Sequence, residues 1–228
     1  LARVEAGRPV VVFLHIPVHS TASLRRGEAV PSPRNAVTNR EALYRLLEPY
    51  AAHVISGHTH ESEHVFEGGI HEHVCGAACG AWWSGPICYD GTPNGYAVYE
   101  VRGEDVRWRY QATGHDPAYQ MRVYDLRMHA PGTDGAARGP VVANVWDWDP
   151  AWSVVWYEDG EPRGPMERRT GTDPLSERLH RGSDLPERRS WVDPVPTDHL
   201  FHATPAPAAR TLRIEATDRF GRVYTVTV

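Results

Sequence analysis

Two stretches decide the fold of this chain: VVVFLH at residues 10–15 and HVISGHTH at residues 53–60. Each is an apolar run that ends in histidine. Residues 10–14 are β-branched, aromatic or aliphatic without a break, which is typical of a strand buried on both faces of a parallel sheet. Pro17 should end that strand shortly after His15.

The segment between the two runs has the pattern of an amphipathic helix. Thr38 and Glu41 have the spacing of a capping box, in which each side chain satisfies an amide left free in the first turn. Apolar residues then follow three and four positions apart: Leu43, Leu46, Leu47 and Tyr50. Pro49 should end the helix.

A strand, a helix and a second strand predict a βαβ unit, whose right-handed crossover makes the two strands parallel. His15 and His58 then leave the sheet at the same edge, where open α/β sheets bind ligands. Gly57 suits a sharp exit from the strand, and His60 follows on the same loop. Three converging imidazoles with an open position indicate a catalytic metal site. The alternative is that each histidine is a hydrogen-bonded structural residue.

These residues resemble a known family. Residues 10–15 and 56–60 resemble the last two metal-binding motifs of calcineurin-like metallophosphoesterases. Residues 77–98 (AACGAWWSGPICYDGTPNGYAV) resemble the strand and loop that follow Gly-His-x-His in one bacterial branch, and residues 141–228 resemble that branch's β-rich C-terminal domain. The resemblance implies a partial metallophosphoesterase α/β sandwich followed by an all-β sandwich domain.

By resemblance, such proteins hold two divalent ions, for example Mn, Fe or Zn, bridged by an aspartate and by a hydroxide that attacks phosphorus. His15 and His58 match ligands of one ion, and His60 matches a ligand of the other. The implied activity is hydrolysis of a phosphate ester, as a phosphatase or phosphodiesterase, by two-metal chemistry. Because ligand imidazoles must be neutral, activity should fall at acidic pH. The resemblance also favours an extracytoplasmic bacterial enzyme.

The chain lacks the family's earlier motifs, an Asp-x-His, a Gly-Asp-x-x-Asp and a Gly-Asn-His followed by an acid. It opens with LARVEAG, without an initiator Met or a signal peptide, which reads as the tail of a helix. We therefore expect the catalytic residues upstream of Leu1, in a missing N-terminal half of the catalytic domain. The isolated chain should be inactive. A degenerate phosphoesterase that keeps its histidines only for structure is a further alternative.

Composition narrows the partners. The chain has 228 residues and a net charge of −5, which argues against a general nucleic-acid surface. Its apolar runs are shorter than the roughly twenty residues of a membrane span. The resemblance implies a small or macromolecular phosphate ester as the partner.

Residues 61–98 contain further histidines, cysteines and a tryptophan pair. His64, His71 and His73 are most simply surface histidines of a hairpin, although His73 could contact substrate or a metal ligand. Cys75, Cys79 and Cys88 could form a small zinc site with His73, or could be small buried side chains. Trp82 and Trp83 could form a wall of a substrate pocket, or could pack beneath a domain junction.

Short strands with turn residues between them fill the C-terminal half, a spacing typical of a β-sandwich of immunoglobulin-like form. We expect strands at 96–101, 107–110, 120–125, 141–145, 153–157, 200–203, 212–216 and 223–228. The expected domains are 1–125 and 126–228. Asp159-Gly160 and residues 218–221 predict hairpin turns.

Two features of this half leave alternatives open. Residues 161–191 form a polar excursion with seven arginines and six acids through Ser190. It is either a solvated loop or an arm that offers Arg168 or Arg169 to a phosphate. Four tryptophans could stack on sugars if exposed, making this a carbohydrate-binding or protein-binding module instead of part of an enzyme: Trp146, Trp148, Trp152 and Trp156. Burial of the rings would remove that surface.

Overall fold

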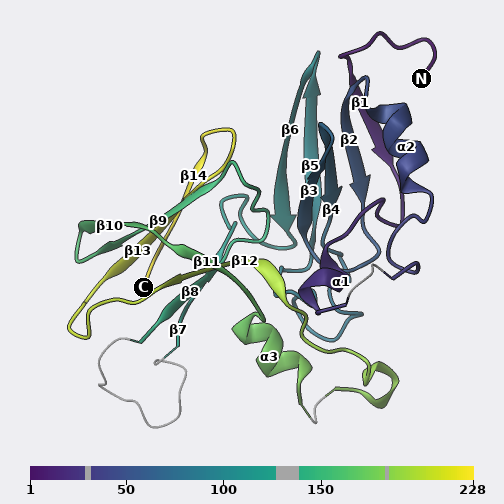
Figure 1. Ribbon diagram of the computed structural model, residues 1–228. Coiled ribbons are helices and arrows are strands. Elements are labelled where there is room, and N and C mark those ends of the chain that lie inside the picture. The colour runs from purple at the N-terminus through teal and green to yellow at the C-terminus, as the bar shows by residue number, and fades with distance from the viewer. Residues whose placement is uncertain (29–31, 127–138, 183–184) are drawn as a thin grey trace.

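The computed structural model describes residues 1–28, 32–126, 139–182 and 185–228. Strands dominate it, and the helices in these ranges are few and short. None of those helices is long and apolar enough to cross a membrane. Figure 1 shows two groups of strands side by side, β1–β6 with α2 in one and β7–β14 with α3 below the other.

The elements of the first group are β1 (Pro9–Phe13), α1 (Ala22–Arg25), α2 (Arg40–Leu47), β2 (Ala51–Ser56), β3 (Glu63–Glu67), β4 (Ile70–Val74), β5 (Gly95–Arg102) and β6 (Asp105–Ala112). Those of the second group are β7 (Arg122–Asp125), β8 (Val141–Asn144), β9 (Ser153–Glu158), β10 (Glu161–Pro165), β11 (Glu167–Gly171), α3 (Pro174–His180), η1 (Glu187–Arg189), β12 (Thr197–Ala203), β13 (Leu212–Thr217) and β14 (Val223–Thr227).

The first sheet has the order β1-β2-β4-β3. β1 and β2 are parallel, with α2 between them in sequence, so the predicted βαβ unit is confirmed. The expected burial of the first strand on both faces is wrong, because Phe13 is 71% exposed. In the described part of the chain β1 is an edge strand with one neighbour, and an edge strand leaves part of its surface uncovered.

The N-cap of helix α2 lies one residue after the predicted cap, and the helix begins at Arg40. Asn39 is its N-cap and makes no side-chain capping bond, so the capping box of Thr38 and Glu41 is wrong. The helix ends at Leu47, before Pro49, as expected. Of the predicted apolar stripe, Leu47 is fully buried and Leu46 is exposed. The buried face of α2 is therefore narrower than the sequence pattern indicated, because packing against the sheet determines which of these side chains are covered.

The first sheet is covered on both faces. On one face, Leu47 of α2 packs with Ala52, Val54 and Ile70. On the other, His71 and His73 of β4 contact Trp108 of the antiparallel β5–β6 hairpin. Because neighbouring residues of a strand point to opposite faces, the sequence Ile70-His71-Glu72-His73 divides its side chains between two layers.

The second group contains two antiparallel sheets, of order β10-β9-β13-β14 and β11-β12-β8-β7. One apolar core joins them, with Ala143 and Phe201 from one sheet and Val154 and Ile214 from the other. The strands expected in this half are present within a few residues. The division at residue 125 remains a proposal; β7, which ends there, pairs with β8.

Burial removes the sugar-stacking interpretation. Trp146 and Trp152 are buried, and Trp148 and Trp156 pack against the core between the sheets. The aromatic faces that would stack on a sugar therefore pack against protein, where these large rings fill the centre between the sheets.

The excursion at 161–191 is not a solvated loop. Its described residues form β10, β11, α3 and η1. Arg168 bonds to Asp198 and lies over Trp148, and Arg169 pairs with Glu167. Both guanidinium groups therefore have partners within this half. The predicted turn at Asp159-Gly160 is confirmed, since both residues have positive φ between β9 and β10.

Candidate functional site

His15 and His58 meet at the edge of the first sheet where β1 and β2 end. His15 Nε2 lies 3.0 Å from His58 Nδ1, and the ring centroids are 4.9 Å apart. The other nitrogen of His58 lies 3.0 Å from the carbonyl oxygen of Arg34 and donates to it, so Nδ1 carries the lone pair. Two nitrogens bound to one ion at about 2.1 Å are separated by roughly 3 Å. The separation is that of a ring-to-ring hydrogen bond and is also compatible with two ligands of one ion.

His60 is held by a different contact. Its Nδ1 donates to the carbonyl oxygen of Gly80 at 2.6 Å, which leaves Nε2 with the lone pair. This arrangement is typical of metal-ligating histidines, whose second ring nitrogen bonds to a carbonyl or carboxylate. Burial lowers the pKa of His60 and so favours the neutral ring that a metal requires. Its ring stacks on Trp82 at 5.0 Å.

Backbone strain concentrates in the same two loops. In the described residues, five residues other than glycine have positive φ: His58, His60, Trp82, Trp83 and Asp159. Four of them lie in the Gly-His-Thr-His loop and in the tryptophan pair. Such conformations cost about 1 kcal/mol or more each and are concentrated at functional sites. Gly57, which was expected to take the sharp exit, does not have positive φ; the turn falls on His58 instead.

A pocket of about 640 Å³ lies beside this edge. Its lining includes His58 and Thr59, then Trp82 and Tyr89 of the following loop, and Trp191 of the C-terminal group. Arg26 and Arg181 also line it, each paired with a carboxylate. Both strand groups therefore contribute to one cavity. Trp83 is exposed and is not in the lining, and Arg181, rather than Arg168 or Arg169, is the arginine that the excursion brings here.

Three buried carboxylates hold the chain that follows His15. Glu72 accepts hydrogen bonds from the backbone amides of Val18 and His19, and Glu63 accepts from Thr21. Glu61 pairs with both Arg25 and Arg26. Burial raises the pKa of Glu61 and of Glu72 to about 7. These contacts fix one rim of the pocket, and sequence reasoning did not identify them.

A second group of histidines lies inside the first sheet. His53, His71 and His73 each offer a ligand atom, and these atoms lie within 4.8 Å of one another. His71 and His73 are 5% and 1% exposed, so the interpretation as surface histidines of a hairpin is wrong. β5 and β6 cover this face of β4. The spacing of His71 and His73 in the sequence indicates that both rings lie on the same face of a strand. That His53 joins them follows only from the strand register, which pairs His53 with His71.

The cysteines do not take part in that group. Cys75, Cys79 and Cys88 are free, and the three-histidine group includes none of them. Burial raises the pKa of the Cys88 thiol well above its usual value, so it behaves as a small apolar side chain.

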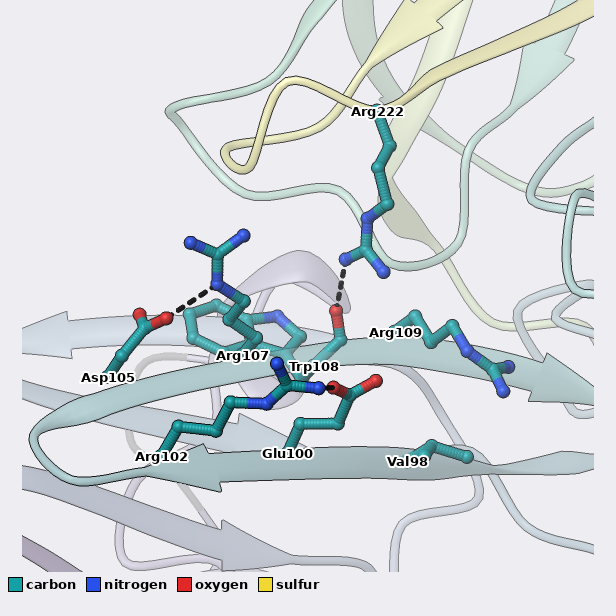
Figure 2. A pocket seen from close by; sticks show the side chains of 8 residues that line it. All are labelled: Val98, Glu100, Arg102, Asp105, Arg107, Trp108, Arg109 and Arg222. Carbon is teal, nitrogen blue, oxygen red and sulfur yellow. Dashed lines mark hydrogen bonds and ion pairs between the residues drawn. The ribbon is translucent and has the colours of Figure 1, made fainter.

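Figure 2 shows a second hollow, of about 410 Å³, on the outer face of the β5–β6 hairpin. Arg102, Arg107, Arg109 and Arg222 line it with Glu100 and Asp105. Arg102 pairs with Glu100, and Arg107 pairs with Asp105. Arg222 pairs with Asp218 and Arg109 bonds to Gln111, neither of which lines the hollow, so the lining has more arginines than acids.

Residues 72–224 match the family described as the C terminal of calcineurin-like phosphoesterase. The match spans well over half of the chain, which therefore belongs to this family. No curated protein and no solved structure matches the chain. Family membership suggests a hydrolase, and the strand-rich architecture is consistent with it.

Proposed function

We propose that this chain supplies metal-ligating histidines and much of the substrate pocket of a metal-dependent phosphoesterase. The observation that carries the proposal is the His15–His58 pair, 3.0 Å apart at the ends of two parallel strands, in a member of the calcineurin-like phosphoesterase C-terminal family. The remaining ligands, including the bridging carboxylate, come from elsewhere in the whole protein.

His15 and His58 would hold one divalent ion, and His60 would hold the other through Nε2. Bound ions of this kind lower the pKa of water and neutralise charge on phosphate oxygens. The protein's own part is to orient the imidazoles. The Arg34 carbonyl orients His58, the Gly80 carbonyl orients His60, and the positive φ of both residues brings their rings to this edge.

The pocket indicates the shape of the substrate. Trp82 and Trp191 are 49% and 59% exposed, and they line the pocket together with Tyr89. Exposed aromatic faces bind flat or ring-shaped groups. We therefore propose that the alcohol part of the phosphate ester carries an aromatic ring or a sugar, which packs against these side chains.

The experiment uses the whole protein with Mn²⁺ and two substrates, p-nitrophenyl phosphate and bis-p-nitrophenyl phosphate. His15→Ala and His58→Ala should each reduce kcat/KM at least about 100-fold, since even the hydrogen-bond partner of a metal ligand costs 10 to 100-fold. Metal content should fall in parallel.

His115→Ala is the matched control, because His115 is exposed and stacks only on Tyr119. It should retain the activity of the unmodified protein. Full activity in both His15→Ala and His58→Ala would contradict the proposal. Absence of activity in the unmodified whole protein toward either substrate would favour the degenerate phosphoesterase instead.

A further inference from the structure

The strongest unexplained feature of the molecule is the group of imidazoles between the first sheet and the β5–β6 hairpin. It lies within the strands and not at their ends, so it is separate from the edge that holds His15 and His58. His53 comes from β2, and His71 and His73 come from β4. His53 is the register partner of His71, which places the three rings on one face of the sheet.

A chain of hydrogen bonds determines which nitrogen of His71 carries its lone pair. Asp147 can only accept, so His64 donates to it from Nε2 over 3.0 Å. His64 Nδ1 is then an acceptor, and it receives the Nε2 proton of His71 over 2.9 Å. The lone pair of His71 is therefore on Nδ1. That atom is buried and has no hydrogen-bond partner among the described residues.

An unpartnered lone pair in the interior costs stability, because it has lost its hydrogen bond to water. A metal ion would satisfy it. A carboxylate bonded to a histidine is also the arrangement that orients metal-ligating imidazoles, and here it acts through one additional ring. His53 Nδ1 and His73 Nε2 lie 3.1 Å apart, a separation that two ligands of one ion also adopt.

The β5–β6 hairpin shields His71 and His73 from water, whereas His53 stays partly exposed. The ring of Trp108 lies against those of His71 and His73, at centroid distances of 4.9 Å and 4.6 Å. Arg222, which comes from the C-terminal turn, donates to the carbonyl oxygen of Trp108 (Figure 2). The nearby guanidinium of Arg219 is balanced by two hydrogen bonds to Asp149. Three imidazoles leave the fourth position of a tetrahedral ion open, and the partly exposed side of His53 lets water take it.

We propose that His53, His71 and His73 bind a zinc ion, with water as its fourth ligand, that joins β2 to β4 beneath the β5–β6 hairpin. Neutral imidazoles are ligands for zinc and similar transition metals, whereas magnesium and calcium prefer oxygen. The proposal is independent of phosphate ester hydrolysis.

The test measures metal content by elemental analysis on the whole protein, produced with added zinc and dialysed against a weak chelator. The starting form is the triple variant His15→Ala, His58→Ala, His60→Ala, which lacks the edge histidines. It should retain about one zinc ion per chain. Adding His53→Gln should remove that ion; His53 is only partly buried, so this change disturbs packing least.

His180→Gln is the matched control. His180 is as buried as His73 and also has an unpartnered ring nitrogen, but no histidine ring contacts it in the described part of the chain. In the triple variant it should leave the zinc content unchanged. Cobalt, added to chelator-treated triple variant, should give the visible absorption of a nitrogen-ligated tetrahedral ion, and His53→Gln should abolish that absorption.

The thermal midpoint of unfolding provides a second measurement, which tests the proposal even if adding His53→Gln impairs folding. Zinc should raise the thermal midpoint of the chelator-treated triple variant, since an ion that binds only the folded state stabilises it. Absence of zinc from the triple variant, together with no change in its midpoint on adding zinc, would overturn the proposal. So would equal zinc content in the variants with and without His53.

Discussion

At the scale of single residues, the histidines differ in their surroundings, and these surroundings determine what each side chain can do. His15 is exposed and pairs with His58, His60 donates to a carbonyl, and His71 lies in the interior with one unpartnered nitrogen. Histidine thus occurs at an exposed sheet edge, in a loop with positive φ, and in the buried layer between the first sheet and the β5–β6 hairpin. The positions of His15 and His60 could be predicted from the sequence, because both residues follow the end of a strand. The burial of His71 could not.

His180 provides a pH prediction at the same scale. Burial lowers the pKa of His180, and the charges of Asp173, Asp193 and Asp90 raise it by less. Among the described residues, no acceptor faces the buried Nε2 that would carry the added proton. The native state therefore takes up fewer protons than the unfolded state, and stability is lost as pH falls below 6.5.

His180→Gln removes this group. Between pH 7.5 and pH 5, the unfolding free energy of the unmodified chain should fall more than that of the variant, by at most about 2 kcal/mol for an unfolded-state pKa of 6.5. Urea unfolding at both pH values measures it. A difference between the two proteins that stays constant with pH would show that His180 takes up its proton equally well in the folded state.

At the scale of elements, the sequence predicted most of the strands and the βαβ connection. Alternation and turn residues located β5, β6, β8, β9 and β12–β14, because half-buried strands have a period of two. The start of α2 was less predictable: the Thr38–Glu41 spacing matched a capping box, yet the N-cap is Asn39 and the helix begins at Arg40. The excursion was misinterpreted because its strands are polar on both faces, so β10 and β11 show no alternation.

Helix α2 gives a prediction from two adjacent leucines. Leu47 is fully buried against Ala52, Val54 and Ile70, whereas Leu46 is 60% exposed. Leu47→Ala should lower the free energy of unfolding by about 2 to 5 kcal/mol, because it leaves a cavity. Leu46→Ala should change it by no more than about 0.5 kcal/mol. Denaturant unfolding compares them, and equal losses would mean that α2 does not cover the sheet as described.

At the scale of the whole molecule, the pocket is assembled from both strand groups. His58 and Trp82 come from the first group, and Arg181 and Trp191 come from the second. Polar contacts hold the groups together: buried Asp90 bonds to Ser62 and His199, and Asn144 donates to the carbonyl oxygen of Asp90. The position of Trp191 over the pocket therefore depends on this junction.

Trp191→Ala tests that contribution in the whole protein. It should raise KM for an aryl phosphate about 3 to 10-fold, the value of one aromatic contact, and leave kcat nearly unchanged. KM for glycerol phosphate should change little. Trp83→Ala is the matched control, because Trp83 is equally exposed but outside the pocket lining. An unchanged KM for the aryl phosphate in Trp191→Ala would show that this ring does not contact substrate.

The sequence by itself determined the parallel strand pair, the exit of His15 and His58 at one edge, and the strands of the C-terminal half, since these depend on local pattern and chain direction. Only the tertiary structure decided that His53, His71 and His73 share a buried layer and that Trp191 lines the pocket beside His58. Both depend on strand register and on packing between segments far apart in the chain, and a local pattern carries no information about either.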